Sequence, residues 1–237
     1  MVIKKFKIKI FADGADINSI KDLNSNSLIS GFTTNPTLMK KAGVTNYKKF
    51  ALEALKVVKN KPISFEVFSD EIKEMEMQAK DIASWGKNIF VKIPITNSKN
   101  EKTFELVKRL SKDSIKCNIT ALFTLEQVKE IYEAVDSNTE TIISIFAGRI
   151  ADSGIDPINT MEQAIKICEK KKNIQILWAS TREVFNIIQA ETIGCHIITV
   201  PHPILQKVSN IGKNLNELSL DTVKSFLSDA QKAGFKI

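Results

Sequence analysis

Short apolar runs alternate with longer amphipathic stretches along the chain. Apolar runs of about 4–7 residues are typical of buried strands, and stretches of about 10–15 residues with a 3.6-residue period are typical of helices. The pattern predicts eight strands, at residues 8–13, 28–32, 63–68, 89–94, 115–119, 141–146, 174–178 and 196–200. It predicts helices between and after them, at residues 16–23, 47–58, 70–85, 101–110, 125–134, 158–170, 182–190 and 201–208.

This alternation predicts a single-domain (β/α)₈ barrel over residues 1–237. The strands are almost continuously apolar, as expected when helices cover a parallel sheet, and the count and length fit such a barrel. A doubly wound open sheet is the alternative, but no Gly-x-Gly-x-x-Gly follows any strand. A further amphipathic helix at about 219–233, beginning at Leu220 and capped by Ser219 or Asp221, is expected to pack on the barrel or on a neighbouring subunit.

Composition narrows the class of protein. With 43% hydrophobic and 26% charged residues the chain is not disordered. No apolar segment approaches the roughly 20 residues of a membrane span, and the first ten residues lack the apolar region of a signal peptide. We therefore expect a cytoplasmic protein that does not bind membranes. The widely spaced Cys117, Cys168 and Cys195 fit neither a disulfide framework nor a zinc cluster, so we expect them in the core and expect no metal or cofactor.

The net charge of +7 favours anionic partners such as phosphorylated metabolites. Only Arg109, Arg149 and Arg182 are arginines, and the remaining positive charge is lysine scattered over helical faces. Nucleic-acid-binding proteins usually cluster arginine and aromatic residues on one face. We therefore expect small phosphorylated ligands and no nucleic acid.

Polar residues interrupt the apolar pattern near the carboxyl ends of the predicted strands. In a (β/α)₈ barrel these ends carry the active site. The residues at these positions are Asp13, Asn35, Glu66, Lys92, Asn118, Thr120, Ser144, Arg149, Ser180 and Arg182.

Lys92 is the strongest candidate for covalent chemistry. It has apolar neighbours on both sides within a predicted strand, and burial without a partner would favour its uncharged, nucleophilic form. Such lysines form Schiff bases with carbonyl substrates. The alternatives are a structural pairing with Glu66 or Asp13, or a side chain that reaches out past the strand end. Glu66 suits proton transfer, with a salt bridge to a helix lysine as its alternative.

Asp13 and Asp16 flank a turn, and either carboxylate could cap the first helix; we favour Asp16 for the cap and leave both roles open for Asp13. Asn35 precedes a proline and fits a helix start as well as a ligand contact. Asn118 and Thr120 are two residues apart and so share one face of a strand.

Arg149 and Arg182 follow the sixth and seventh predicted strands, where barrels often bind phosphate. The planar guanidinium group suits phosphate because it donates two parallel hydrogen bonds. The sequence therefore indicates a phosphate clamp, with helix-surface salt bridges as the alternative. Arg109 lies beside Lys108 on a predicted helix and is expected at the surface.

Seven stretches, in order, resemble the transaldolase family of Schiff-base enzymes. They are ADGAD at 12–16, TTNPTL at 33–38, FEV at 65–67, VKIPIT at 91–96, NIT at 118–120, SIFAGRI at 144–150 and ASTR at 179–182. The resemblance implies a (β/α)₈ transferase that moves a dihydroxyacetone unit from a ketose phosphate (sedoheptulose 7-phosphate or fructose 6-phosphate) to an aldose phosphate (glyceraldehyde 3-phosphate or erythrose 4-phosphate), in the non-oxidative pentose phosphate pathway.

The resemblance also implies roles for individual residues. Lys92 would form the Schiff base, Glu66 would act as acid and base through a bound water that Thr120 helps to position, and Asp13 would take the proton of the hydroxyl beside the breaking bond. The residues implied in substrate binding are Thr33, Asn35, Asn118, Ser144 and Phe146 for the sugar, and Arg149, Ser180 and Arg182 for the phosphate.

Two other functions remain open at this stage. Fructose-6-phosphate aldolases resemble this chain in fold and release free dihydroxyacetone, but they characteristically have Gln in place of Glu66 and Tyr in place of Phe146, which favours transfer here. A non-catalytic barrel that binds sugar phosphates is the second alternative. The chain length resembles the short branch of the family, which implies a homo-oligomer, a pentamer or decamer in which the last helix reaches a neighbour.

Overall fold

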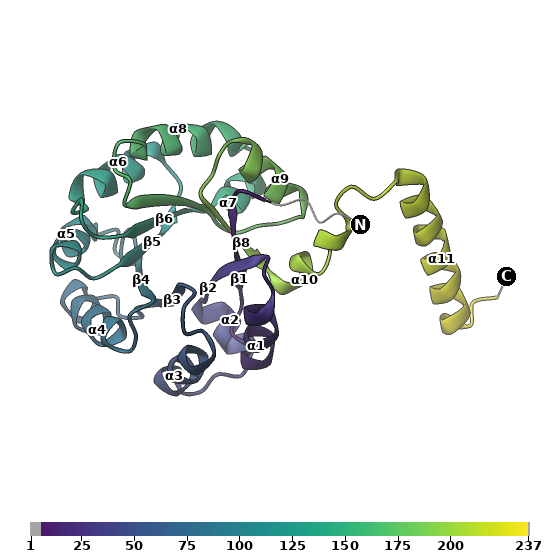
Figure 1. Cartoon of the computed structure of the whole chain (residues 1–237), viewed down its shortest axis with the longest axis horizontal. Helices are drawn as coiled ribbons and strands as arrows, with labels where there is room; N and C mark the ends of the chain where they lie inside the picture. Colours follow the sequence, from purple (N-terminus) through teal and green to yellow (C-terminus); the bar gives the residue numbers. More distant parts are fainter. Residues whose placement is uncertain (1–5, 237) are drawn as a thin grey trace.

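The computed structural model describes residues 6–236, and its eight parallel strands close into a barrel. Each strand pairs with the next along the chain, and the last pairs with the first, as Figure 1 shows looking down the molecule. The predicted (β/α)₈ barrel is confirmed. The strands are β1 Lys9–Asp13, β2 Ile29–Thr33, β3 Ile63–Glu66, β4 Ile89–Pro94, β5 Cys117–Leu122, β6 Thr141–Ile145, β7 Ile174–Trp178 and β8 Ile197–Pro201.

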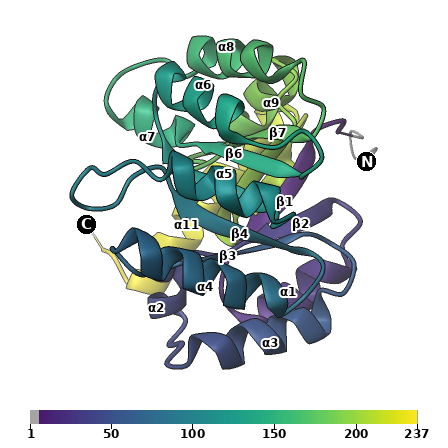
Figure 2. The same cartoon turned by 90° about the vertical axis from the view of Figure 1, so that its left-hand side faces the viewer.

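Helices surround the strands and supply the outer half of the core (Figure 2). They are α1 Ile17–Ser25, α2 Pro36–Lys41, α3 Tyr47–Val57, α4 Ile72–Ser84, α5 Phe104–Lys112, α6 Leu125–Ala134, α7 Ala147–Asp152, α8 Ile158–Cys168, α9 Phe185–Thr192, α10 His202–Leu205 and α11 Leu215–Ala233, with a 3₁₀ turn, η1, at Val208–Asn210. Within residues 6–236, no helix combines the length and apolarity needed to cross a bilayer.

Helix caps and buried cysteines follow the sequence predictions closely. The Asp16 carboxylate accepts a hydrogen bond from the Ser19 N–H at 2.7 Å and so caps α1. Asn35 caps α2, with Pro36 in its first turn. The cysteines are buried and free. Arg109 lies at the surface, where its Nη2 contacts Glu76 at 2.7 Å.

Two predicted segments need correction. Residues 147–152 form the short helix α7, although the pattern predicted no helix between residues 134 and 158. The last helix, expected from Leu220, begins at Leu215 with Asn214 as its cap. Asn214 is a suitable cap and Leu215 and Leu218 are three residues apart, so the sequence already carried the signal for this earlier start. None of the α11 residues is buried, and the helix projects away from the barrel (Figure 1).

A second, smaller apolar cluster fills the inside of the barrel. Its members come from β1, β4, β6, β7 and β8: Phe11, Phe90, Ile142, Leu177, Ala179 and Ile197. Gly31 of β2 belongs to the same level, because a Cβ atom there would lie 2.6 Å from the Phe11 ring. The ring thus occupies the space that a side chain at position 31 would need.

This packing predicts that Gly31→Ala destabilises the barrel by about 1–3 kcal/mol, the usual cost of overpacking a filled core. Urea unfolding followed by circular dichroism measures it. Phe11→Leu in the same chain should recover part of the loss, so that the double variant loses less than the sum of the two single variants. Gly14→Ala is the matched control, since a Cβ at position 14 meets nothing within 4 Å. Equal stability of Gly31→Ala and the parent protein would contradict this account.

Candidate active site

A layer of polar side chains lies directly above the apolar cluster. Side chains on a strand alternate between its two faces, so the residue two positions beyond an inward-facing one also faces inward. Phe11 is followed in this way by Asp13, Phe90 by Lys92, and Ile197 by Thr199. The strands therefore deliver their polar groups to the carboxyl-terminal mouth of the barrel, where the sequence predicted them.

Lys92 is held inside this mouth by two contacts. Its side-chain nitrogen lies 3.0 Å from a carboxylate oxygen of Glu66 and donates a hydrogen bond of 2.9 Å to the backbone carbonyl of Thr34. The residue is 7% exposed. Of the alternatives left open by the sequence, the structure shows the pairing with Glu66, so Lys92 is not the unpartnered amine that its apolar neighbours suggested. Before Lys92 can act as a nucleophile it must pass a proton to a base, and Glu66 is within reach.

Asp13 ends β1 beside this pair. Its carboxylate accepts a hydrogen bond of 2.8 Å from the Thr33 hydroxyl. Burial raises the pKa of Asp13, and the nearby charge of Glu66 raises it further, while the Lys92 charge and hydrogen bonds from Thr33 and Asn35 oppose the rise. Burial is the largest of these effects. A carboxylate with a raised pKa is a stronger base at neutral pH, which suits proton abstraction.

A chain of buried hydrogen bonds crosses the barrel interior opposite Asp13. The Ser144 hydroxyl donates to the Asn118 side-chain carbonyl at 2.6 Å, and the Asn118 amide donates to the Ser64 hydroxyl at 3.0 Å. Amide and hydroxyl groups fixed in this way can exchange hydrogen bonds with the hydroxyl groups of a sugar. The Thr120 hydroxyl is buried and has no partner within residues 6–236, so it is available to hold a water or a substrate atom.

The start of α7, which follows β6, packs closely against the loop after β7. A Cβ atom on Gly148 would lie 1.6 Å from the backbone oxygen of Ser180, and the Gly148 N–H donates to the Ala179 carbonyl at 3.3 Å. Ser180 itself has a φ of 64°, in the left-handed region. Only glycine at position 148 permits this approach.

Both predicted phosphate-binding arginines lie in this region and are exposed, Arg149 within α7 and Arg182 after β7. The Arg149 guanidinium lies over the Phe146 ring, 5.3 Å from its centroid. The Arg182 Nε donates a hydrogen bond of 3.2 Å to a carboxylate oxygen of Asp152. The salt-bridge alternative thus holds for Arg182, whereas the Arg149 guanidinium forms no ion pair within residues 6–236.

Comparison with known proteins decides the family. A family profile described as "Transaldolase/Fructose-6-phosphate aldolase" matches residues 10–237. The chain belongs to this family. A protein named "Probable transaldolase" from Thermoanaerobacter sp. is 33% identical over 231 residues, which cover 97% of this chain and all of the relative. Another of the same name, from Clostridium kluyveri, is 36% identical over 200 residues and covers 84% of this chain and 88% of the relative.

One solved structure with a similar fold is thiamine phosphate pyrophosphorylase from Pyrococcus furiosus. It aligns with a TM-score of 0.55 at 12% identity, covering 82% of this chain and 86% of that chain. At this identity the likeness shows the barrel fold alone.

This transaldolase-family chain places the residues predicted from its sequence at one end of the barrel, but three contributors were missed. They are the Thr34 carbonyl that accepts from Lys92, the Ser64 hydroxyl that accepts from Asn118, and the Thr199 hydroxyl that contacts Thr33. Ser64 and Thr199 could have been found from the period of two: Ser64 lies two residues before Glu66, and Thr199 two residues after Ile197. A backbone carbonyl leaves no such signal.

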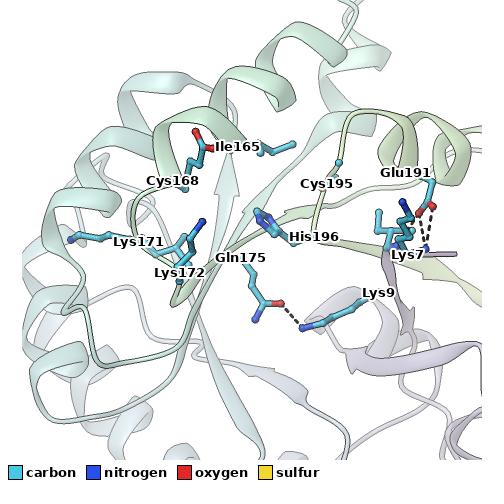
Figure 3. A pocket seen from close by; sticks show the side chains of 14 residues that line it. Lys7, Lys9, Ile165, Cys168, Lys171, Lys172, Gln175, Glu191, Cys195 and His196 are labelled. Atoms are coloured by element: carbon cyan, nitrogen blue, oxygen red, sulfur yellow. Dashed lines mark hydrogen bonds between the residues drawn. The ribbon is translucent and has the colours of Figure 1, made fainter.

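A cavity of about 550 Å³ lies at the opposite, amino-terminal end of the barrel, near the starts of β1, β7 and β8 (Figure 3). Its lining includes His196, whose Nδ1 accepts the Ile176 N–H at 3.0 Å. Burial lowers the pKa of His196, and the charges of Lys9 and Lys172 lower it further. The ring thus serves as a structural acceptor. Within residues 6–236, no three His, Cys, Asp or Glu side chains gather as metal ligands would.

Proposed function

We propose that this protein is a transaldolase that carries a dihydroxyacetone unit on Lys92. The observation that supports it best is the buried Lys92–Glu66 pair, 3.0 Å apart, with the Asp13 carboxylate beside it. One amine and two carboxyl groups in differing environments are the groups that Schiff-base formation and carbon–carbon cleavage require. The names of the relatives agree with this function.

In the first stage, Lys92 forms the covalent intermediate. The amine passes a proton to Glu66 and attacks the C2 carbonyl of a ketose phosphate such as sedoheptulose 7-phosphate or fructose 6-phosphate, and a second proton moves from the nitrogen to the carbonyl oxygen to give a carbinolamine. The carbinolamine hydroxyl then leaves as water with a proton returned by Glu66, and a cationic imine remains on Lys92. A water held by Thr120 would extend the reach of Glu66 to that hydroxyl, and the buried, unpartnered Thr120 oxygen is suited to hold it.

In the second stage, the C3–C4 bond breaks. Asp13 accepts the proton of the C4 hydroxyl, the bonding electrons move into the imine to give an enamine, and an aldose phosphate departs. The enamine then attacks the aldehyde carbon of an acceptor such as glyceraldehyde 3-phosphate or erythrose 4-phosphate, and the steps reverse. The raised pKa of Asp13 favours its role as the base. We place the reaction in the non-oxidative pentose phosphate pathway.

The remaining polar groups would hold the substrate. Asn118 and Ser144 are already fixed by their mutual hydrogen bond, so little side-chain freedom is lost when they bind the hydroxyls of the three-carbon unit. Asn35 would bind the same unit. The phosphate would be held by Arg149, Ser180 and Arg182. Arg182 would release Asp152 in order to bind it.

Trapping with borohydride tests the covalent step. In the presence of fructose 6-phosphate, sodium borohydride should reduce the imine and add a three-carbon fragment to Lys92, detected by peptide mass spectrometry. Lys92→Met should show no such adduct and should lose transfer activity by at least 10³-fold, the scale expected when a covalent nucleophile is removed. The exposed Lys108→Met is the control. An unmodified Lys92 under saturating donor would favour a non-catalytic sugar-phosphate-binding barrel.

Transfer and simple aldol cleavage differ in how the enamine is discharged. Phe146 has no hydroxyl group that could protonate the enamine, and its ring contacts the Phe123 ring, 5.8 Å away between centroids, and the Arg149 guanidinium. We therefore expect transfer to erythrose 4-phosphate to be faster than release of free dihydroxyacetone, measured side by side by coupled assays. Phe146→Tyr should raise release relative to transfer. Faster release than transfer in the parent protein would identify it as a fructose-6-phosphate aldolase instead.

We also propose that the protein is a homo-oligomer, a pentamer or decamer, in which α11 contacts a second copy. Leu220, Val223 and Leu227 recur along one face of this helix and are 53%, 59% and 59% exposed. Size-exclusion chromatography with light scattering should give a multimer for the parent protein. The double variant Val223→Asp, Leu227→Asp should give smaller species, whereas Ser225→Asp on another face should not. A monomeric parent protein would refute this proposal.

A further inference from the structure

We propose that Thr199 is a positioning residue for Asp13, acting through the hydroxyl of Thr33; the catalytic part of this inference rests on the proposed function. The two threonine oxygens are 2.5 Å apart, and Thr33 in turn contacts Asp13 at 2.8 Å. Thr199 lies on β8, Thr33 on β2, and Asp13 on β1 between them. The Thr33 hydroxyl thus contacts one side chain on the adjacent strand β1 and one on β8, the next strand beyond it.

The direction of the hydrogen bonds follows from counting protons. A threonine hydroxyl has one proton to donate. The Thr33 proton is donated to the Asp13 carboxylate, so the short contact between the two hydroxyls must use the proton of Thr199. Thr199 therefore donates to Thr33, and Thr33 donates to Asp13. Hydrogen bonds in such a chain polarise one another, so the first strengthens the second.

Thr199 is held in place for this task. It is 6% exposed, and its backbone carbonyl accepts a hydrogen bond of 2.7 Å from the buried Thr181 hydroxyl. Its backbone also lies opposite Phe11 in the β1–β8 ladder, which fixes its height in the barrel. The donor at the start of the hydrogen-bond chain is thus attached to β1 and to the loop after β7, and its rotamer is restricted by burial.

The consequence for Asp13 concerns both its orientation and its charge. The hydrogen bond from Thr33 fixes one oxygen of the Asp13 carboxylate. The same bond favours the ionised carboxylate and so lowers the pKa of Asp13 against the effect of burial. The Thr33 hydroxyl has its proton committed to Asp13, so we assign it to this relay, whereas the resemblance had implied a place for Thr33 in sugar binding.

Removing the Thr199 hydroxyl should therefore impair Asp13 specifically. In Thr199→Val, which keeps the side-chain shape, the Thr33 bond to Asp13 weakens and the pKa of Asp13 rises further. Because Asp13 must be ionised to accept the proton, the acid limb of the kcat–pH profile should move to higher pH. We expect kcat to fall about tenfold, the factor that corresponds to roughly 1.4 kcal/mol, with KM little changed.

Two variants separate this role from packing. Thr199→Ser retains the hydroxyl but removes a methyl group, so it should restore the pH profile and most of kcat. Thr141→Val removes a buried threonine hydroxyl from β6 and should leave both unchanged. An unshifted acid limb in Thr199→Val, or a Thr199→Ser variant as impaired as Thr199→Val, would overturn the proposal.

A measurement independent of turnover distinguishes this inference from the proposed function. Carbon-13 NMR of protein labelled at aspartate carboxyl groups gives the pKa of Asp13, whose resonance is the one absent from Asp13→Asn. It should be higher in Thr199→Val than in the parent protein and in Thr199→Ser. An equal pKa in all three would exclude the relay even in an active transaldolase, whereas the shift in a protein that fails borohydride trapping would refute only the enzymatic function.

Discussion

The buried ion pair between Lys92 and Glu66 is the constraint around which the barrel mouth is arranged. Removing two charges from water is costly, and their mutual attraction compensates only when the geometry is good and the remaining donors are satisfied. Here the Lys92 nitrogen lies 3.0 Å from a carboxylate oxygen of Glu66 and donates a hydrogen bond to the Thr34 carbonyl. Both charges are therefore held in contact in the barrel mouth, where the proposed proton transfer from Lys92 to Glu66 would take place.

Stability and chemistry are divided between two levels of the same strands. The lower level is apolar and packed so closely that Gly31 has no room for a side chain beside Phe11. The upper level carries charges, amides and hydroxyls, most of them paired with each other. Because consecutive levels are only two residues apart, the rigid lower level fixes the backbone from which Lys92 and Asp13 project. The strands thus fix the backbone of these polar residues, and hydrogen bonds such as the one from Thr33 to Asp13 fix their side chains.

The sequence was sufficient for the barrel and for most of its mouth, because both depend on local periodicity. Strand and helix periods predicted the eight units, and polar residues at strand ends predicted most of the inward-facing groups, although Ser64 and Thr199 were missed. The features that the sequence did not predict are mainly contacts between residues far apart in the chain. The approach of Gly148 to Ser180 and the contact of Thr33 with Thr199 are of this kind, and no residue near one partner identifies the other. The start of α11 is an exception, because Asn214 is a suitable cap and Leu215 and Leu218 are three residues apart, as on one face of a helix.

The charges at the mouth also impose an order on the proposed reaction. Burial and the negative charge of Glu66 oppose the ionisation of Asp13, and the positive charge of Lys92 favours it. When Lys92 passes its proton to Glu66, the amine no longer favours ionised Asp13, but Glu66 also ceases to oppose it. Once the imine forms, its protonated nitrogen restores the positive charge at the position of the Lys92 ammonium. The charge that favours ionised Asp13 is therefore present again at the stage when the proposed mechanism requires Asp13 to act as a base.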